Sequence, residues 1–108
     1  MKIVIEFEAE KKEYELGKLI RAKDRIYTEA SNKLTENAKK EEDTDDEDYD
    51  LMVSTLVKLY DNQFTEEEIN ENMETADITT AFMDILIYKQ TKLNKNMEQR
   101  RKDFTKGK

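Results

Sequence analysis

Strongly apolar side chains are scarce in this sequence, and their scarcity limits what the chain can fold into. Leu, Ile, Val and Phe together provide 23 of the 108 residues, whereas 42% of the residues are charged. A highly charged chain with less than about 20% of these apolar residues is expected to be disordered. A domain of this length buries only about 60–65% of the surface that its unfolded chain exposes. We therefore expect one thin domain with a modest core, which assembly with a partner would stabilise.

Several classes of function are disfavoured by what the sequence lacks. It has no His and no Cys, so it lacks disulfides, thiolate metal ligands and the side chain best suited to proton transfer near neutral pH. Its glycines are Gly17 and Gly107, which cannot build a Gly-rich phosphate loop. We therefore expect no catalytic residue, no metal site and no cofactor.

The charge and the hydropathy of the chain restrict its partners. A net charge of -7 disfavours binding to the phosphate backbone of nucleic acids. No apolar run is long enough to span a membrane, and the N-terminus lacks the basic-then-apolar order of a signal peptide. These features predict a soluble protein that binds other proteins, with neither a nucleic acid nor a membrane as its partner.

The N-terminal residues show the two-residue alternation that is typical of β-strands. Ile3, Ile5 and Phe7 alternate with polar residues, and Tyr14 and Leu16 repeat the pattern shortly afterwards. This alternation predicts a β-hairpin over residues 2–16. Because an isolated hairpin is only marginally stable, we expect it to pack against helices.

Apolar residues at three- and four-residue steps predict helices over residues 17–38, 50–62 and 76–88. The three stripes consist of Leu16, Leu19, Ile20, Ile26, Tyr27, Ala30 and Leu34, then Tyr49, Met52, Val53, Leu56, Leu59 and Tyr60, and finally Ile78, Ala81, Phe82, Ile85 and Leu86. With a fourth, short helix, the predicted fold class is mainly α (α+β). We expect a small bundle of about four helices with a short N-terminal β-hairpin and a charged C-terminal tail.

The short helix, predicted over residues 65–73, has the clearest local signal. Thr65 and Glu68 have the spacing of a capping box, in which each side chain accepts the backbone N–H of the other residue. Phe64 and Ile69 occupy the two positions of a hydrophobic staple. The expected role of these four residues is structural.

Charge is distributed unevenly along the chain. Residues 39–50 contain an acidic run and are predicted to be a mobile linker. A calcium loop counted from Asp43 fails, because Asp48 and Ser54 stand where glycine and glutamate are required. Residues 89–108 carry a net charge of +6, whereas residues 1–88 carry -13. We expect an acidic body over residues 1–88 and a basic tail, either a helical extension or disordered, over residues 89–108.

The order of these elements resembles the tail assembly chaperones of long-tailed (siphovirus-type) phages of Gram-positive hosts. The resemblance lies in the hairpin and in the Leu51–Tyr60 helix, the Asn62–Ile69 turn and the Asp77–Tyr88 helix. The chain departs from the family pattern because Asn70–Glu74 contains no Gly and the last helix contains no Pro.

The resemblance implies a protein of the host cytoplasm that is absent from the mature virion. It implies that the chain binds and solubilises the tape measure protein, helps recruit tail tube protein and forms a homo-oligomer. It also implies a frameshift-extended form of the chain. Tyr60, Phe82, Ile85 and Tyr88 are candidates for a surface that binds clients or a second copy, although core packing is the commoner role of such residues. Two alternatives stay open, an acidic inhibitor that mimics nucleic acid and an unassigned helical protein-interaction module.

Overall fold

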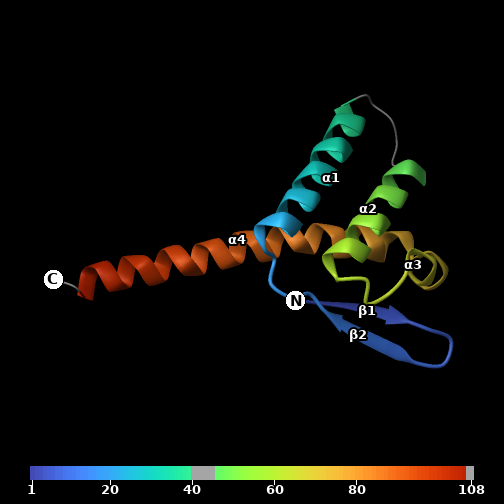
Figure 1. Cartoon of the computed structure of the whole chain (residues 1–108), viewed down its shortest axis with the longest axis horizontal. Helices are drawn as coiled ribbons and strands as arrows, with labels where there is room; N and C mark the ends of the chain where they lie inside the picture. Colours follow the sequence, from blue (N-terminus) through green and yellow to red (C-terminus); the bar gives the residue numbers. More distant parts are fainter. Residues whose placement is uncertain (40–45, 107–108) are drawn as a thin grey trace.

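The computed structural model describes residues 1–39 and 46–106, which form one hairpin and four helices (Figure 1). The elements are β1 (Lys2–Glu6), β2 (Lys11–Glu15), α1 (Arg21–Lys39), α2 (Asp46–Leu59), α3 (Glu66–Asn72) and α4 (Thr75–Lys106). In Figure 1, α1 and α2 lie above the N-terminal half of α4, and the hairpin lies below it. The predicted fold class, mainly α with an N-terminal hairpin, is confirmed.

The hairpin is antiparallel, and its alternation places one face in the core. Ile3 pairs with Tyr14, and both Ile3 and Ile5 are buried, whereas Val4 is exposed. At the tip, the backbones of Phe7 and Glu10 exchange hydrogen bonds of 2.7 and 3.3 Å. The two residues between them have no positive φ, so the turn is not of the primed types that favour glycine.

Helix α1 begins at Arg21, four residues later than the sequence predicts. The backbone N–H of Leu16 donates to the carbonyl of Met1 (2.8 Å), which continues the pairing of the hairpin beyond Glu15. Residues 16–20 therefore form a connection that leads away from the hairpin. Leu16 remains buried, but Ile20 is left exposed.

Helix α2 begins at Asp46, so the structure corrects the predicted linker over residues 46–50. Asp46, Glu47 and Asp48 lie in the first turn of the helix, where negative charge complements the helix dipole. Asn37 Nδ2 donates to Oδ1 of the buried Asp48 (2.8 Å), which ties this turn to α1. Of the rest of the predicted mobile segment, Lys39 is the last residue of α1, and residues 40–45 lie outside the described residues.

The end of α2 is closed by a Schellman motif. The N–H of Asn62 donates to the carbonyl of Val57 (3.0 Å), and the N–H of Asp61 donates to that of Lys58 (3.2 Å). Asp61 and Asn62 have φ values of 57° and 59°, a region that Asp and Asn tolerate better than most residues. The motif turns the chain sharply towards α3.

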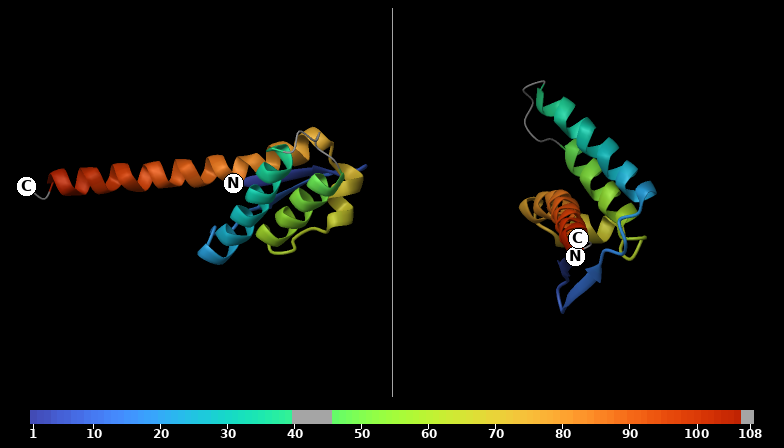
Figure 2. Two further views of the ribbon diagram at one scale, coloured as in Figure 1. Left: turned by 90° about the horizontal axis from the view of Figure 1, so that it is seen from above. Right: turned by 90° about the vertical axis from the view of Figure 1, so that its left-hand side faces the viewer.

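Helix α4 is continuous from Thr75 to Lys106, through the boundary at residue 88 that the apolar pattern predicted. Its sequence contains neither Gly nor Pro, and beyond Tyr88 it consists mainly of residues that favour helices. Of the two forms expected for the tail, the structure has the helical extension. This extension projects away from the other elements (Figures 1 and 2).

The hydrophobic core lies between the hairpin, α1, α2, α3 and the N-terminal half of α4. Its buried members are Ile3, Ile5, Leu16, Tyr27, Ala30, Met52, Val53, Leu56, Leu59, Tyr60, Phe64, Ile69, Ile78, Phe82 and Ile85. None of the residues 90–102 is buried. The C-terminal half of α4 therefore owes its position to the helix itself and not to packing in the core.

Candidate functional site

The predicted cap residues lie at the start of α3 and hold this helix in place. Glu68 N donates to Thr65 Oγ1 (3.1 Å), and Thr65 N donates to Glu68 Oε1 (3.0 Å), so the capping box is complete. Phe64 and Ile69 are both buried on either side of the cap. The ring of Phe64 also contacts Tyr14 of β2 edge to face, at 5.1 Å between centroids. These residues stabilise the fold and offer no open binding surface.

Three of the four candidate surface residues lie inside the core, which corrects the sequence-based expectation. Tyr60 and Ile85 have no exposed surface, and Phe82 has only 4%. Tyr88 is half-buried. A surface made of these four side chains therefore does not exist in this conformation, and only Tyr88 borders open space.

Burial also determines the chemistry of Tyr60. Desolvation, with smaller contributions from the negative charges of Asp84 and Glu15, raises its pKa to about 12. Its hydroxyl group is buried and has no hydrogen-bond partner among the described residues. The phenol therefore stays protonated at neutral pH and is not suited to act as a base.

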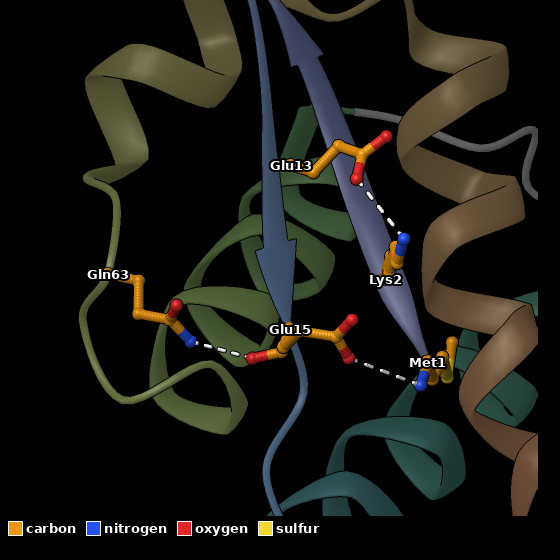
Figure 3. A network of polar contacts seen from close by, with 5 residues as sticks. All are labelled: Met1, Lys2, Glu13, Glu15 and Gln63. Atoms are coloured by element: carbon orange, nitrogen blue, oxygen red, sulfur yellow. Dashed lines mark hydrogen bonds and ion pairs between the residues drawn. The ribbon is translucent and has the colours of Figure 1, made fainter.

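Polar contacts attach the open end of the hairpin to the turn after α2 (Figure 3). Gln63 Nε2 donates to the carbonyl oxygen of Glu15 (2.8 Å), and the amino group of Met1 lies 3.7 Å from Glu15 Oε2. Across the strands, Lys2 Nζ lies 3.2 Å from Glu13 Oε2. These groups hold elements together, and their geometry is that of structural contacts.

Helix α1 is fastened to α4 at one crossing point. The rings of Tyr27 and Phe82 lie 4.8 Å apart, and Lys89 Nζ lies 5.7 Å from the centre of the Tyr27 ring. The same ammonium group forms an ion pair with Asp24 Oδ1. On both sides of this crossing, α1 and α4 diverge and leave open space.

The larger of these spaces is a groove of about 860 Å³ between residues 18–24 and the Leu86–Asn96 part of α4. We call it the α4 groove. Leu19 and Ile20 form one apolar wall, and Leu86 and Leu93 form the other, with Tyr88 nearby. The charged lining is mainly basic. Its basic residues are Lys18, Arg21, Lys89 and Lys92, and its acidic residue is Asp24. Apolar walls and a basic rim are the features with which a groove can bind a peptide segment.

An exposed apolar stripe runs along α4 beside this groove. Met83, Leu86, Ile87, Leu93 and Met97 are each between 43 and 59% exposed. Met83 and Leu86 also line a second groove, of about 380 Å³, between α1, α2 and α4. Large apolar side chains that gather on one exposed face commonly mark a site of protein association.

Sequence reasoning missed this surface, although part of its signal is present in the sequence. Leu93 and Met97 continue the apolar period of the helix beyond Tyr88, but the prediction assigned them to a basic tail that was either a helical extension or disordered, and not to a surface shared with Leu86. Ile20 was assigned to a helical stripe and instead stands in the connection before α1. Ile20 lies opposite Leu93 because of the way in which α1 crosses α4. A local sequence pattern does not show how two helices cross.

The described residues hold no group of His, Cys, Asp or Glu side chains that would bind a metal ion. Among the same residues, no helix is both long enough and apolar enough to cross a membrane. What the surface does provide is apolar area beside cations.

Comparison with known proteins identifies the family of the chain. The sequence profile of a family described as "Phage tail chaperone protein" matches residues 1–108. The chain therefore belongs to the phage tail chaperone family. Searches of curated proteins and of solved structures found no significant match.

Proposed function

We propose that this chain is a non-enzymatic tail assembly chaperone that binds the tape measure protein, keeps it soluble and helps recruit tail tube protein. The observation that carries the proposal is the α4 groove with the exposed apolar residues beside it. A soluble chain rarely leaves such a surface uncovered unless a partner occupies it. Membership of the tail chaperone family makes a tail protein the natural partner.

The charge of the body suits the proposed role. Residues 1–88 carry a net charge of -13, and a strong net charge keeps protein complexes in solution. A chain that covers an apolar client helix with its groove and presents this acidic body to the solvent would keep the client from aggregating. The same acidity would also fit an inhibitor that mimics nucleic acid, but the basic extension and the family give that alternative no support.

The proposal extends to the setting of tail assembly. The chain would act in the host cytoplasm as a homo-oligomer, would be absent from the mature virion, and would work beside a frameshift-extended form of itself. A long-tailed phage of a Gram-positive host would be its source. The basic extension of α4 supports this view, because a helix that projects from the body can connect it to another subunit.

Co-expression with the tape measure protein tests the function. We expect the wild-type chain to keep the tape measure protein in the soluble fraction and to co-purify with it. The double variant Leu93→Glu/Met97→Glu, which places charge on the exposed face without touching the core, should lose both properties. Thr91→Glu is the matched control, because Thr91 is exposed but does not line the groove. A tape measure protein that stays insoluble with the wild-type chain would refute the proposed function.

A further inference from the structure

We infer that the α4 groove binds an amphipathic α-helix of the client that carries acidic residues beside its apolar stripe. The inference rests on the proposed function in that it takes the occupant to be a client segment. It adds the secondary structure and the charge of that segment. Both follow from the residues that line the groove and from the spacing of the exposed residues along α4.

The spacing of the exposed side chains indicates a helical occupant. Met83, Leu86, Gln90, Leu93 and Met97 follow each other at steps of three, four, three and four residues. This is the heptad spacing with which one helix packs along another. The stretch extends about 21 Å at 1.5 Å per residue. A strand would meet these side chains only at intervals, whereas a helix parallel or antiparallel to α4 contacts each of them.

The second wall of the groove fits the same occupant. Leu19 and Ile20 stand opposite Leu86 and Leu93, and Ile20 is 54% exposed. A helix that lies on α4 can place its own apolar stripe against both walls at once. This geometry resembles the general mode in which an amphipathic helix is held in an apolar groove.

The rim of the groove indicates the charge of the occupant. Lys18, Arg21 and Lys92 make no ion pair within residues 1–38 and 46–102, whose side chains the structure describes, whereas Lys89 is paired with Asp24. The groove therefore presents three cations that a carboxylate on the occupant can meet. The α4 extension of a second copy would instead bring further lysines and arginines. Like charges across an interface disfavour a complex, so pairing between two α4 extensions is disfavoured as the main use of the groove.

Gln90 provides a means of setting the register. It is the polar residue in a row that is otherwise apolar, between Leu86 and Leu93. A polar residue at a seam position favours a partner with a hydrogen-bonding side chain opposite and penalises shifted registers. We therefore expect the preferred client helix to have Asn or Gln at one position of its apolar stripe.

Binding of designed peptides to the full chain tests the inference. Three fluorescein-labelled helical peptides share one heptad stripe of leucines and carry Glu, Gln or Lys at the flanking positions. An exposed ion pair contributes about a two- to fivefold change in affinity, so two or three pairs should make the Glu peptide bind at least about fourfold more tightly than the Lys peptide. Fluorescence anisotropy measures the three affinities at low and at high salt.

Charge reversal in the chain provides the matched comparison. Lys92→Glu removes a cation of the rim, whereas Lys95→Glu makes the same change on the same helix at an exposed residue that does not line the groove. We expect Lys92→Glu to weaken the binding of the Glu peptide at least about fivefold and Lys95→Glu less than about twofold. Equal effects of the two variants, or equal affinity for the Glu and Lys peptides, would overturn the inference.

Two further results separate this inference from its alternatives. If the chain forms a dimer by sedimentation that Leu93→Glu abolishes and that the Glu peptide does not displace, the occupant is a second copy and the inference is wrong. If the Glu peptide binds as expected but the tape measure protein is not solubilised, the proposed function fails while the preference of the groove stands. If Lys92→Glu leaves the tape measure complex intact and the peptides do not bind, the function stands and the inference fails.

Discussion

Replacing Thr65 with Ala removes one side of the capping box that starts α3. This helix has only seven residues, far fewer than a helix needs to persist alone. It therefore depends on its cap and on the burial of Phe64 and Ile69. The Thr65 side chain is exposed, so the substitution leaves no cavity. The expected loss is that of an N-cap, about 1 kcal/mol of unfolding free energy.

The two reciprocal hydrogen bonds of the capping box also predict how two substitutions in it combine. Both hydrogen bonds join Thr65 to Glu68, at 3.1 and 3.0 Å, so the effects of Thr65→Ala and Glu68→Ala should not add. Contacting residues commonly couple by about 0.5 kcal/mol or more. We expect the double variant to lose less stability than the two single variants together. Thr65→Ser, which keeps the hydroxyl group, is the control and should remain close to wild type.

Urea unfolding followed by far-ultraviolet circular dichroism measures these differences. A loss of 1 kcal/mol should also lower the melting temperature by about 4–8 °C for a domain of this size. A change below about 0.3 kcal/mol for Thr65→Ala would mean that the cap does not hold α3. Strict additivity of the two single variants would mean that the two bonds contribute independently and do not reinforce each other.

Four further outcomes are expected. Leu56→Ala should cost about 2–5 kcal/mol in the same urea experiment, because this side chain is fully buried. Asn62→Gly should stabilise the chain by up to about 1 kcal/mol, because glycine adopts the φ of 59° without a steric penalty. Since Tyr60 has a pKa of about 12 when folded and an ordinary value of 10.0, its stabilising contribution is complete below pH 10 and is lost as the pH rises towards 12. Wild type should therefore lose about 2–3 kcal/mol more than Tyr60→Phe over this range, and equal losses would contradict the buried phenol. Light scattering at about 50 mM salt should detect self-association between the acidic body and the basic extension that high salt reverses, and a monomer under both conditions would exclude charge-driven assembly.

The parts of the fold that are local in the sequence could be predicted from it. The alternation of Ile3 and Ile5 is enough to identify the strand, and the Thr65–Glu68 spacing identifies the start of α3. The start of α1 was missed because the strand pairing continues to Leu16, whose N–H donates to the carbonyl of Met1, a residue distant from it in the sequence. Helical periodicity alone cannot show that a backbone group already has a partner.

The start of α2 and the proposed binding surface were missed for a related reason. An acidic run looks like a solvated linker until Asn37 on another helix supplies a partner for Asp48. For the surface, the sequence shows that Phe82 and Leu93 lie on an amphipathic helix, but not how far along it the core extends. The crossing of α1 over α4 decides that Phe82 is buried and Leu93 is exposed.

The position of the hairpin at the N-terminus has a consequence for synthesis on the ribosome. β1 packs against α3 and shares a core with Ile69, yet the two strands emerge before any of their helical partners. At about 5–20 residues per second, the segment from Leu16 to Asn72 takes roughly 3–11 s to be made. During this time the apolar face of the hairpin has nothing to cover it. The ion pairs Lys2–Glu13 and Glu6–Lys11 on its other face place charge on both strands, and charged strands discourage pairing with a neighbouring nascent chain.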